Sequence, residues 1–324
     1  MSKRLPRVVL TAPVSRLPEE LLAGRARVRV LRHRKPLTEE RLASALRSAD
    51  GALTYLSDPV TAKVLEGCPR LKVVANHAVG VNNIDLAAAR ARGVVVTYTP
   101  GVLTEATADL TWALILGTAR RAAEGDRMVR RGKFHGWAAD LLLGMDLRGK
   151  TLGVVGLGRI GQAVARRAPA FGLKVVYAQR SRADGCVEAA LGTVRLTLDD
   201  LVRTADVLTL HCPLTEETRG LMGRERLFAM KPGALFVNAS RGGLHDEAAL
   251  VEALAAGHLG GAGLDVFENE PALSPGLVGL DNVLLLPHAG SATHETRAAM
   301  ARMALSDLLA VLEGREPEHP VPAG

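Results

Sequence analysis

Three side chains with types suited to acid–base chemistry on a carboxylate-bearing molecule follow apolar runs of the chain. Arg241 lies in FVNASRGGLHDE, Glu270 in GAGLDVFENEP and His288 in NVLLLPHAGSATHE. Arginine binds a carboxylate through two parallel hydrogen bonds. Histidine exchanges protons near neutral pH, and a nearby carboxylate orients it and favours its protonated form. Each residue type is common in structural roles, so the set gains weight only together with a cofactor motif.

A glycine-rich turn between an apolar run and a helix-like segment supplies that motif. In GKTLGVVGLGRIGQAVARRA, Gly156, Gly158 and Gly161 have G-x-G-x-x-G spacing. In a strand–turn–helix context the first glycine permits a tight turn, the second lets a pyrophosphate approach and the third lets the helix pack closely. The alternative is a glycine turn without a ligand. The context favours a dinucleotide site.

The end of the next apolar run indicates which dinucleotide binds. NAD enzymes usually place an acidic residue about twenty residues after the turn, for the ribose hydroxyls. This chain has Gln179, Arg180, Ser181 and Arg182 there. Two arginines flanking a serine suit a 2′-phosphate, whereas the alternative is a solvated basic loop. The loop predicts a preference for NADPH, with NADH possible.

Short apolar runs alternate with helix-like segments along the chain, which is typical of a parallel α/β architecture. A first series of strands is expected at residues 7–10, 28–31, 52–54, 71–75 and 94–97, with helices at 39–48 and 85–92. A second series of six is expected at 152–156, 173–178, 207–210, 234–238, 261–265 and 283–286. Six strands with intervening helices suit a dinucleotide-binding fold.

Two longer helical segments follow these series. One helix is expected to start near Thr104 and run through LTWALILGTARRAAEGDRMVRRG as a connector or interface element. The segment SATHETRAAMARMALSDLLAVLEG has apolar residues at helical spacing. It is expected to pack back on the first series and make that domain discontinuous.

Composition excludes several classes of protein. The 324 residues suggest two domains, and no apolar run approaches the roughly eighteen residues of a membrane span. The N-terminus lacks the pattern of a signal peptide. Cys68, Cys186 and Cys212 have neither metal-site nor disulfide spacing, so a reduced cytoplasmic protein without a metal is expected.

The formal net charge of +7 does not indicate nucleic-acid binding. Basic residues are spread along the chain, often beside acidic ones, and form no stripe interleaved with aromatic residues. A diffuse positive field suits small anionic ligands at least as well.

Seven stretches together resemble the D-isomer-specific 2-hydroxyacid dehydrogenases, and within them the glyoxylate/hydroxypyruvate reductase branch. They are NHAVGVNNID, TPGVLTEATADL, GLGRIGQAVARRA, QRSR, NASRGG, GAGLDVFENEP and PHAGSATHETR. The resemblance covers nearly the whole chain. It implies an α/β fold of two doubly wound parallel-sheet domains, with the active site in the cleft. The Rossmann cofactor domain would span 100–289, and a flavodoxin-like, discontinuous substrate domain would comprise 1–99 and 290–324.

The same resemblance implies roles for individual residues. Arg241, Glu270 and His288 match the family's catalytic set, with Pro271 selecting Glu270 over Glu268. The substrate would contact Arg241, His288 and the backbone amides at Val79 and Gly80. Trp137 resembles an aromatic residue that reaches the substrate from a neighbouring subunit, and the long helix from Thr104 would belong to the interface of a homodimer. The expected cofactor contacts are Thr107, Gly156, Gly158, Arg159, Ile160, Gly161, Gln179, Arg180, Ser181, Arg182, Cys212, Pro213, Ala239, Asp265 and Gly290.

The expected reaction is NADPH-dependent reduction of glyoxylate or hydroxypyruvate to glycolate or D-glycerate, with His288 as the general acid. One alternative is another dehydrogenase of the family, acting on 3-phosphoglycerate, D-lactate or formate. The other is a cofactor-sensing protein similar to the family's transcriptional corepressors, because fold alone does not fix function.

Overall fold

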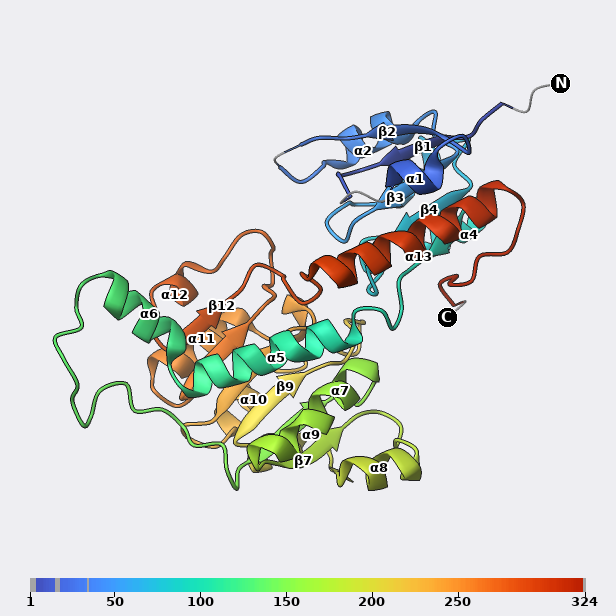
Figure 1. Cartoon of the computed structure of the whole chain (residues 1–324). Coiled ribbons are helices and arrows are strands. Elements are labelled where there is room, and N and C mark those ends of the chain that lie inside the picture. Colours follow the sequence, from blue (N-terminus) through green and yellow to red (C-terminus); the bar gives the residue numbers. More distant parts are fainter. Residues whose placement is uncertain (1–3, 15–17, 34, 323–324) are drawn as a thin grey trace. The chain divides into compact units, whose positions relative to one another are not determined.

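The computed structural model describes residues 4–14, 18–33 and 35–322. The chain divides into two compact units (Figure 1). One unit comprises Met1–Leu103 with Ser291–Gly324, and the other is Thr104–Gly290. Each contains a parallel sheet with flanking helices, which confirms the expected α/β class.

The first unit is built on a five-stranded sheet with strand order β2-β1-β3-β4-β5. All its neighbouring strands are parallel. The strands are β1 (Arg7–Leu10), β2 (Arg27–Val30), β3 (Gly51–Thr54), β4 (Val73–Asn76) and β5 (Val95–Thr97). Each lies within two residues of its expected position.

Helices cover both faces of this sheet, because its strands carry apolar residues on both sides. Val9 and Val74 pack into a core with α2, α3 and α4, whereas Val8 and Val73 pack into another with α1 and α13. The helices are α1 (Pro18–Leu22), α2 (Glu39–Leu46), α3 (Ala62–Glu66), α4 (Leu86–Ala91) and α13 (His294–Leu312). The C-terminal helix α13 therefore belongs to the same unit as the N-terminal strands.

The second unit contains a seven-stranded parallel sheet with order β12-β11-β10-β9-β6-β7-β8. Its strands are β6 (Thr151–Val155), β7 (Lys174–Ala178), β8 (Val194–Arg195), β9 (Val207–Leu210), β10 (Leu235–Asn238), β11 (Gly261–Leu264) and β12 (Val283–Leu285). The six expected strands are confirmed, but the expected total was wrong, because two-residue β8 is too short to show a pattern. The strand order reverses at β6, where a ligand site is expected beyond the strand ends.

Helices line both faces of this second sheet. The helices of this unit are α5 (Thr104–Ala119), α6 (Ala122–Arg130), α7 (Arg159–Arg167), α8 (Gly185–Leu191), α9 (Leu198–Thr204), α10 (Arg224–Ala229), α11 (Glu247–Ala255) and α12 (Pro275–Val278), of which α6 has no buried residue. Two short 3-10 helices occupy Ala168–Phe171 and Gly242–Leu244. No helix among the described residues is long and apolar enough to cross a membrane.

The single long helix expected from Thr104 was wrong, because the chain breaks between α5 and α6. Arg121 adopts a left-handed conformation with φ of 50°, and its guanidinium makes two 2.9 Å hydrogen bonds to Glu124. The Ala119 carbonyl accepts from the Met145 amide at 2.8 Å instead of continuing the helix. The later loop thus closes the end of α5.

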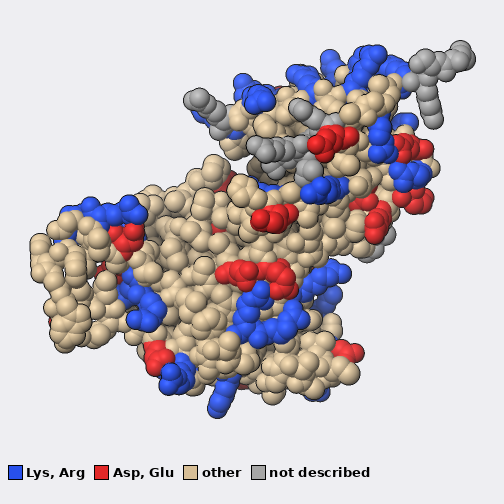
Figure 2. Space-filling model, in the orientation of Figure 1, with Lys and Arg blue, Asp and Glu red and all other residues tan. Residues whose placement is uncertain are grey.

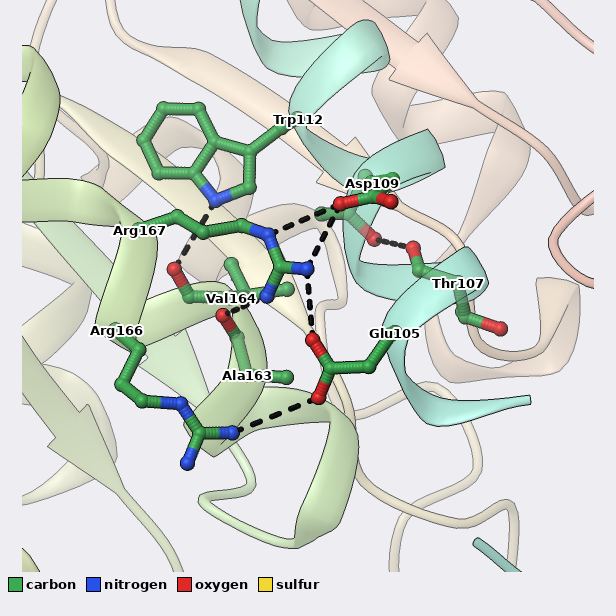
Figure 3. Close-up of polar contacts among 9 residues, drawn as sticks. Glu105, Thr107, Asp109, Trp112, Ala163, Val164, Arg166 and Arg167 are labelled. Atoms are coloured by element: carbon green, nitrogen blue, oxygen red, sulfur yellow. Dashed lines mark hydrogen bonds and ion pairs between the residues drawn. The ribbon is translucent and has the colours of Figure 1, made fainter. Parts of the chain in front are cut away.

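Helix α5 is fixed along α7 (Figure 3). The Arg167 guanidinium lies 2.7 Å from Glu105 and 2.8 Å from Asp109. The Trp112 indole donates to the Val164 carbonyl at 3.0 Å. The ion pairs are largely exposed and contribute little alone, so the buried Trp112 contributes more to holding α5, and Thr107 with it, beside α7.

On the face shown in Figure 2, lysines and arginines occur on both units, with acidic side chains beside many of them.

Candidate active site

The glycine-rich turn joins β6 to α7 at the carboxyl edge of the sheet. Gly156 has φ of 95°, and a Cβ there would lie 2.7 Å from the Cys212 amide nitrogen. A Cβ on Gly161 would overlap the Gly156 carbonyl oxygen. Both positions therefore require glycine, one for the turn and one for the helix approach.

Gly158 differs from the other two glycines because the space around it is open. A Cβ there would meet no atom within 4 Å. Gly158 is the N-cap of α7 and provides no side-chain cap, so the first-turn amides near Arg159 and Ile160 are suited to an anion. The turn therefore fits the pyrophosphate of a dinucleotide.

The loop after β7 uses its four predicted residues differently. The Gln179 side-chain oxygen accepts from the Leu157 amide at 2.9 Å, which ties the strand end to the glycine turn. The Arg182 guanidinium makes hydrogen bonds of 2.8–3.1 Å to Glu188. Hydrogen bonds from Arg182 and Tyr177 hold the pKa of Glu188 below its ordinary value. Arg180 and Ser181 are exposed.

Strands β9 and β10 bring Cys212, Pro213 and Ala239 to the same edge. The Ser240 hydroxyl donates to the Cys212 carbonyl at 2.7 Å and links the two strand ends. Burial raises the pKa of the Cys212 thiol to about 11. The thiol is therefore protonated at neutral pH and is not a nucleophile.

His288 and Glu270 form a pair beyond the ends of β12 and β11. His288 Nδ1 lies 2.8 Å from Glu270 Oε2, and Glu270 Oε1 accepts from the Phe267 amide at 3.0 Å. His288 has φ of 54°, and its amide donates to the Asp265 carbonyl at 2.9 Å. Both the ring and the backbone of His288 are therefore fixed, and no hydrogen bond joins Nε2 to another described residue.

The Asp265 carboxylate supports the turn that carries His288. It accepts from the amides of Ala289 at 2.7 Å and Gly290 at 2.8 Å. Thr107 completes this arrangement, because its hydroxyl donates to the Gly290 carbonyl at 3.2 Å. Burial raises the pKa of Asp265 above its ordinary value despite these amides.

Arg241 follows β10, the neighbour of β11. Its Nη1 donates to the Ser240 carbonyl at 2.7 Å, and its own carbonyl accepts from the Asn238 side chain at 2.8 Å. Burial lowers the pKa of Arg241, while Glu270 opposes that effect. An arginine remains charged under such conditions.

Glu270 is ionised at neutral pH. Burial raises its pKa, but His288, the Phe267 amide and the Arg241 charge outweigh burial, so the pKa lies below its ordinary value. The ends of three adjacent strands thus carry a cation, a carboxylate and an imidazole. Together they can bind an anion and protonate an oxygen.

Val79 and Gly80 lie in the other unit, in the loop after β4. The Asn76 side chain donates to the Gly80 carbonyl at 2.9 Å and holds the loop. The amides of Val79 and Gly80 are not donors in any backbone–backbone hydrogen bond between described residues.

Several residues around the site were missed by sequence reasoning. Asn238 fixes the Arg241 turn and also contacts buried His245, with 3.1 Å between Asn238 Nδ2 and His245 Nδ1. Asn238 lies inside the NASRGG stretch, so the motif contained a signal for it. Glu188 and Arg195, which contact the loop after β7, carried no such signal.

A phosphate-binding turn beside an Arg, Glu and His set defines a dinucleotide-dependent oxidoreductase. Residues 112–290 match the family model "D-isomer specific 2-hydroxyacid dehydrogenase, NAD binding domain". The chain belongs to the D-isomer specific 2-hydroxyacid dehydrogenase family, and it is an NAD(P)-dependent enzyme of that class.

Similar proteins match over almost their full lengths. A glyoxylate reductase of Aeropyrum pernix is 47% identical over 97% of this chain and 95% of its own. A crystal structure of a Thermus thermophilus protein is 50% identical, covering 98% of this chain and 100% of that one, with a TM-score of 0.91. The NADPH-dependent glyoxylate/hydroxypyruvate reductase of Sinorhizobium meliloti, in complex with NADP and malonate, is 36% identical, with coverage of 98% and 97% and a TM-score of 0.86.

Proposed function

We propose that the enzyme reduces glyoxylate or hydroxypyruvate to glycolate or D-glycerate and prefers NADPH. The observation that carries the proposal is the fixed His288–Glu270 pair beside Arg241 at the ends of adjacent strands. The glyoxylate reductases among the relatives support the substrate class.

The residues of this chain divide the work as follows. The turn from Gly156 to Gly161 would hold NADPH, which would supply the hydride. Arg241 binds the substrate carboxylate and polarises the keto group. His288 gives a proton from Nε2 to the keto oxygen, while ionised Glu270 orients the ring and stabilises its charged form. Val79 and Gly80 are proposed, on the family resemblance, to donate their amides to the same carboxylate.

The residues at the end of β7 support the proposed preference for NADPH. Gln179 stands where an NAD enzyme has an acid, and its side-chain oxygen is bonded to Leu157. Arg180 and Ser181 stand exposed beside it and can bind a 2′-phosphate. The NADP complex of the Sinorhizobium relative supports this assignment.

The segment after α5 supports a homodimer. No residue of α6 is buried, and large apolar side chains are exposed on α6 and on the loop that follows it. The exposed fractions are 62% for Val129, 53% for Phe134, 85% for Trp137 and 65% for Leu143. Such a concentration of exposed apolar groups is typical of an interface. A second copy of the chain is proposed to cover it, with Trp137 reaching the substrate of that copy.

The test of the reaction is the loss of NADPH absorbance with glyoxylate, hydroxypyruvate or pyruvate, repeated with NADH. Fast turnover of either of the first two substrates with NADPH is expected. Turnover of pyruvate alone, or of none, overturns the proposed substrate, and equal efficiency with NADH overturns the cofactor preference. Light scattering of the purified protein tests the dimer independently.

A further inference from the structure

The loop that follows β7 is fastened at both ends. At its start, the Gln179 side chain accepts from the Leu157 amide at 2.9 Å. At its end, the Tyr177 hydroxyl accepts from the Ala183 amide at 3.0 Å and donates to Glu188 at 2.5 Å. The residues between these points therefore have a restricted backbone.

Arg195 holds the middle of this loop from the neighbouring strand β8. Its Nη2 donates to the Gln179 carbonyl at 3.0 Å and to the Arg180 carbonyl at 2.8 Å. Its Nε donates to the same Gln179 carbonyl at 3.3 Å. One guanidinium thus fixes two consecutive carbonyls. These peptide groups set the direction in which the Arg180 and Ser181 side chains project.

Apart from the contacts of Arg195, strand β8 contributes few interactions to the fold. It is two residues long and lies at the edge of the sheet, and both residues are exposed. Val194 is 62% exposed, so β8 adds little to the core. The contacts of Arg195 with the loop are the main interactions that this strand provides beyond its pairing with β7.

Arg182 is already occupied by a carboxylate. Its guanidinium holds Glu188 through both oxygens, and the Glu188 side chain is only 10% exposed. The opposite charges of Arg182 and Glu188 offset each other, so Arg180 in the loop and Arg195 on β8 supply the remaining positive charge. Among the described residues, no hydrogen bond or ion pair involves the Arg180 guanidinium or the Ser181 hydroxyl.

We propose that Arg195 is a positioning residue for cofactor specificity: by bridging the Gln179 and Arg180 carbonyls it presents Arg180 and Ser181 to the 2′-phosphate. Arg182 has a structural role instead, as the partner of Glu188. This inference rests on the proposed preference for NADPH. It gives different roles to Arg180 and Arg182, which look equivalent in the sequence. It also adds a third arginine, Arg195, from strand β8.

The test is calorimetric binding of 2′,5′-ADP, which carries the 2′-phosphate, against 5′-AMP, which lacks it. Arg180→Met is expected to weaken the binding of 2′,5′-ADP about 10- to 100-fold, the scale of a charge-assisted hydrogen bond. Arg195→Met is expected to weaken it about 3- to 10-fold, because the loop must then be ordered on binding. Neither change should weaken the binding of 5′-AMP more than about twofold, because 5′-AMP has no 2′-phosphate and its binding does not require this loop to be ordered.

Three further variants make the result specific. Arg203→Met, an exposed arginine on α9, is the matched control and should leave both ligands unchanged. Arg195→Lys should recover part of the affinity, because an ammonium can still donate to both carbonyls. Arg182→Met should lower the melting temperature, since it leaves Glu188 without its cation, while wild-type discrimination between the two ligands is kept.

The kinetic counterpart is a higher KM for NADPH in Arg195→Met, with kcat and the KM for NADH unchanged. Equal weakening of 2′,5′-ADP and 5′-AMP would show that Arg195 only supports the fold. If the wild type prefers 2′,5′-ADP to 5′-AMP but Arg195→Met binds 2′,5′-ADP as tightly as the wild type does, the role of Arg195 is overturned while the preference for NADPH stands. A wild type that binds both ligands equally overturns the NADPH preference and this role with it.

Discussion

His288 Nδ1 lies 2.8 Å from Glu270 Oε2, within hydrogen-bond distance. The backbone of His288 has a φ of 54°. A positive φ is uncommon in a residue with a side chain. Here it is held by the hydrogen bond from the His288 amide to the Asp265 carbonyl at 2.9 Å. The local structure therefore determines where the ring points and which nitrogen faces Glu270, and Nε2 is the nitrogen that would give the proton in the mechanism we propose.

The first prediction concerns the proton transfer. His288→Ala should lower kcat by about two to four orders of magnitude, the scale of general acid catalysis. Glu270→Gln should also lower kcat, because it keeps the shape of the side chain but removes the charge that stabilises imidazolium. NADPH binding, followed by fluorescence, should change little in both variants. Near-normal turnover in His288→Ala would remove His288 from the mechanism.

The second prediction contrasts two glycines of one motif. Gly158→Ala should fold normally, because a Cβ there meets nothing within 4 Å, but the methyl group should weaken NADPH binding. Gly161→Ala should instead lower the melting temperature, because its Cβ overlaps the Gly156 carbonyl oxygen. Thermal unfolding and cofactor titration of both variants separate the two effects. Equal melting temperatures would contradict the packing role of Gly161.

The sequence predicted most of the fold because parallel strands buried on both faces appear as short apolar runs. It failed where tertiary contacts override local pattern. Nothing in LGTARRAAEG shows that Met145 takes the Ala119 carbonyl and that the helix therefore ends there. The β8 strand was missed because its two residues are exposed and form no pattern.

The candidate site shows the same division. Arg241, Glu270 and His288 were predicted from residue type and position after strands, with the family resemblance selecting Glu270 over Glu268, and the structure places all three at the ends of adjacent strands. The loop after β7 could not be resolved further, because Arg180 and Arg182 look alike in sequence. Only the structure shows that Glu188, six residues after Arg182, occupies one of them.

The third prediction concerns carboxylate binding. Arg241→Lys keeps a positive charge but loses the planar pair of donors. It should raise the KM for glyoxylate and lower kcat, and together these changes should reduce kcat/KM by about ten- to a hundredfold, the scale of one charge-assisted hydrogen bond. The KM for NADPH should be nearly unchanged. A variant with wild-type kcat/KM would exclude Arg241 from substrate binding.

The fourth prediction concerns acid stability and buried His245, which is 2% exposed. Burial lowers its pKa from 6.5 to about 4. Above pH 6.5 the ring is neutral in both folded and unfolded chains, so it has no effect on the pH dependence. As the pH falls from 6.5 towards 4, His245 is protonated in the unfolded chain but stays neutral in the folded chain. The free energy of unfolding therefore decreases by on the order of 3 kcal/mol. Below about pH 4 the loss from this group ends.

His245→Leu should therefore flatten the dependence of unfolding free energy on pH between 6.5 and 4, as measured by urea denaturation. The leucine also removes Nε2, a buried nitrogen without a hydrogen-bond partner among the described residues. It removes the contact of Nδ1 with Asn238 as well, so some stability at neutral pH should be lost. His211, whose pKa burial also lowers to about 4, should preserve part of the slope in the variant. His294→Gln, at an exposed histidine, is the matched control. A slope in His245→Leu equal to that of the wild type would show that the buried ring does not cause the acid sensitivity.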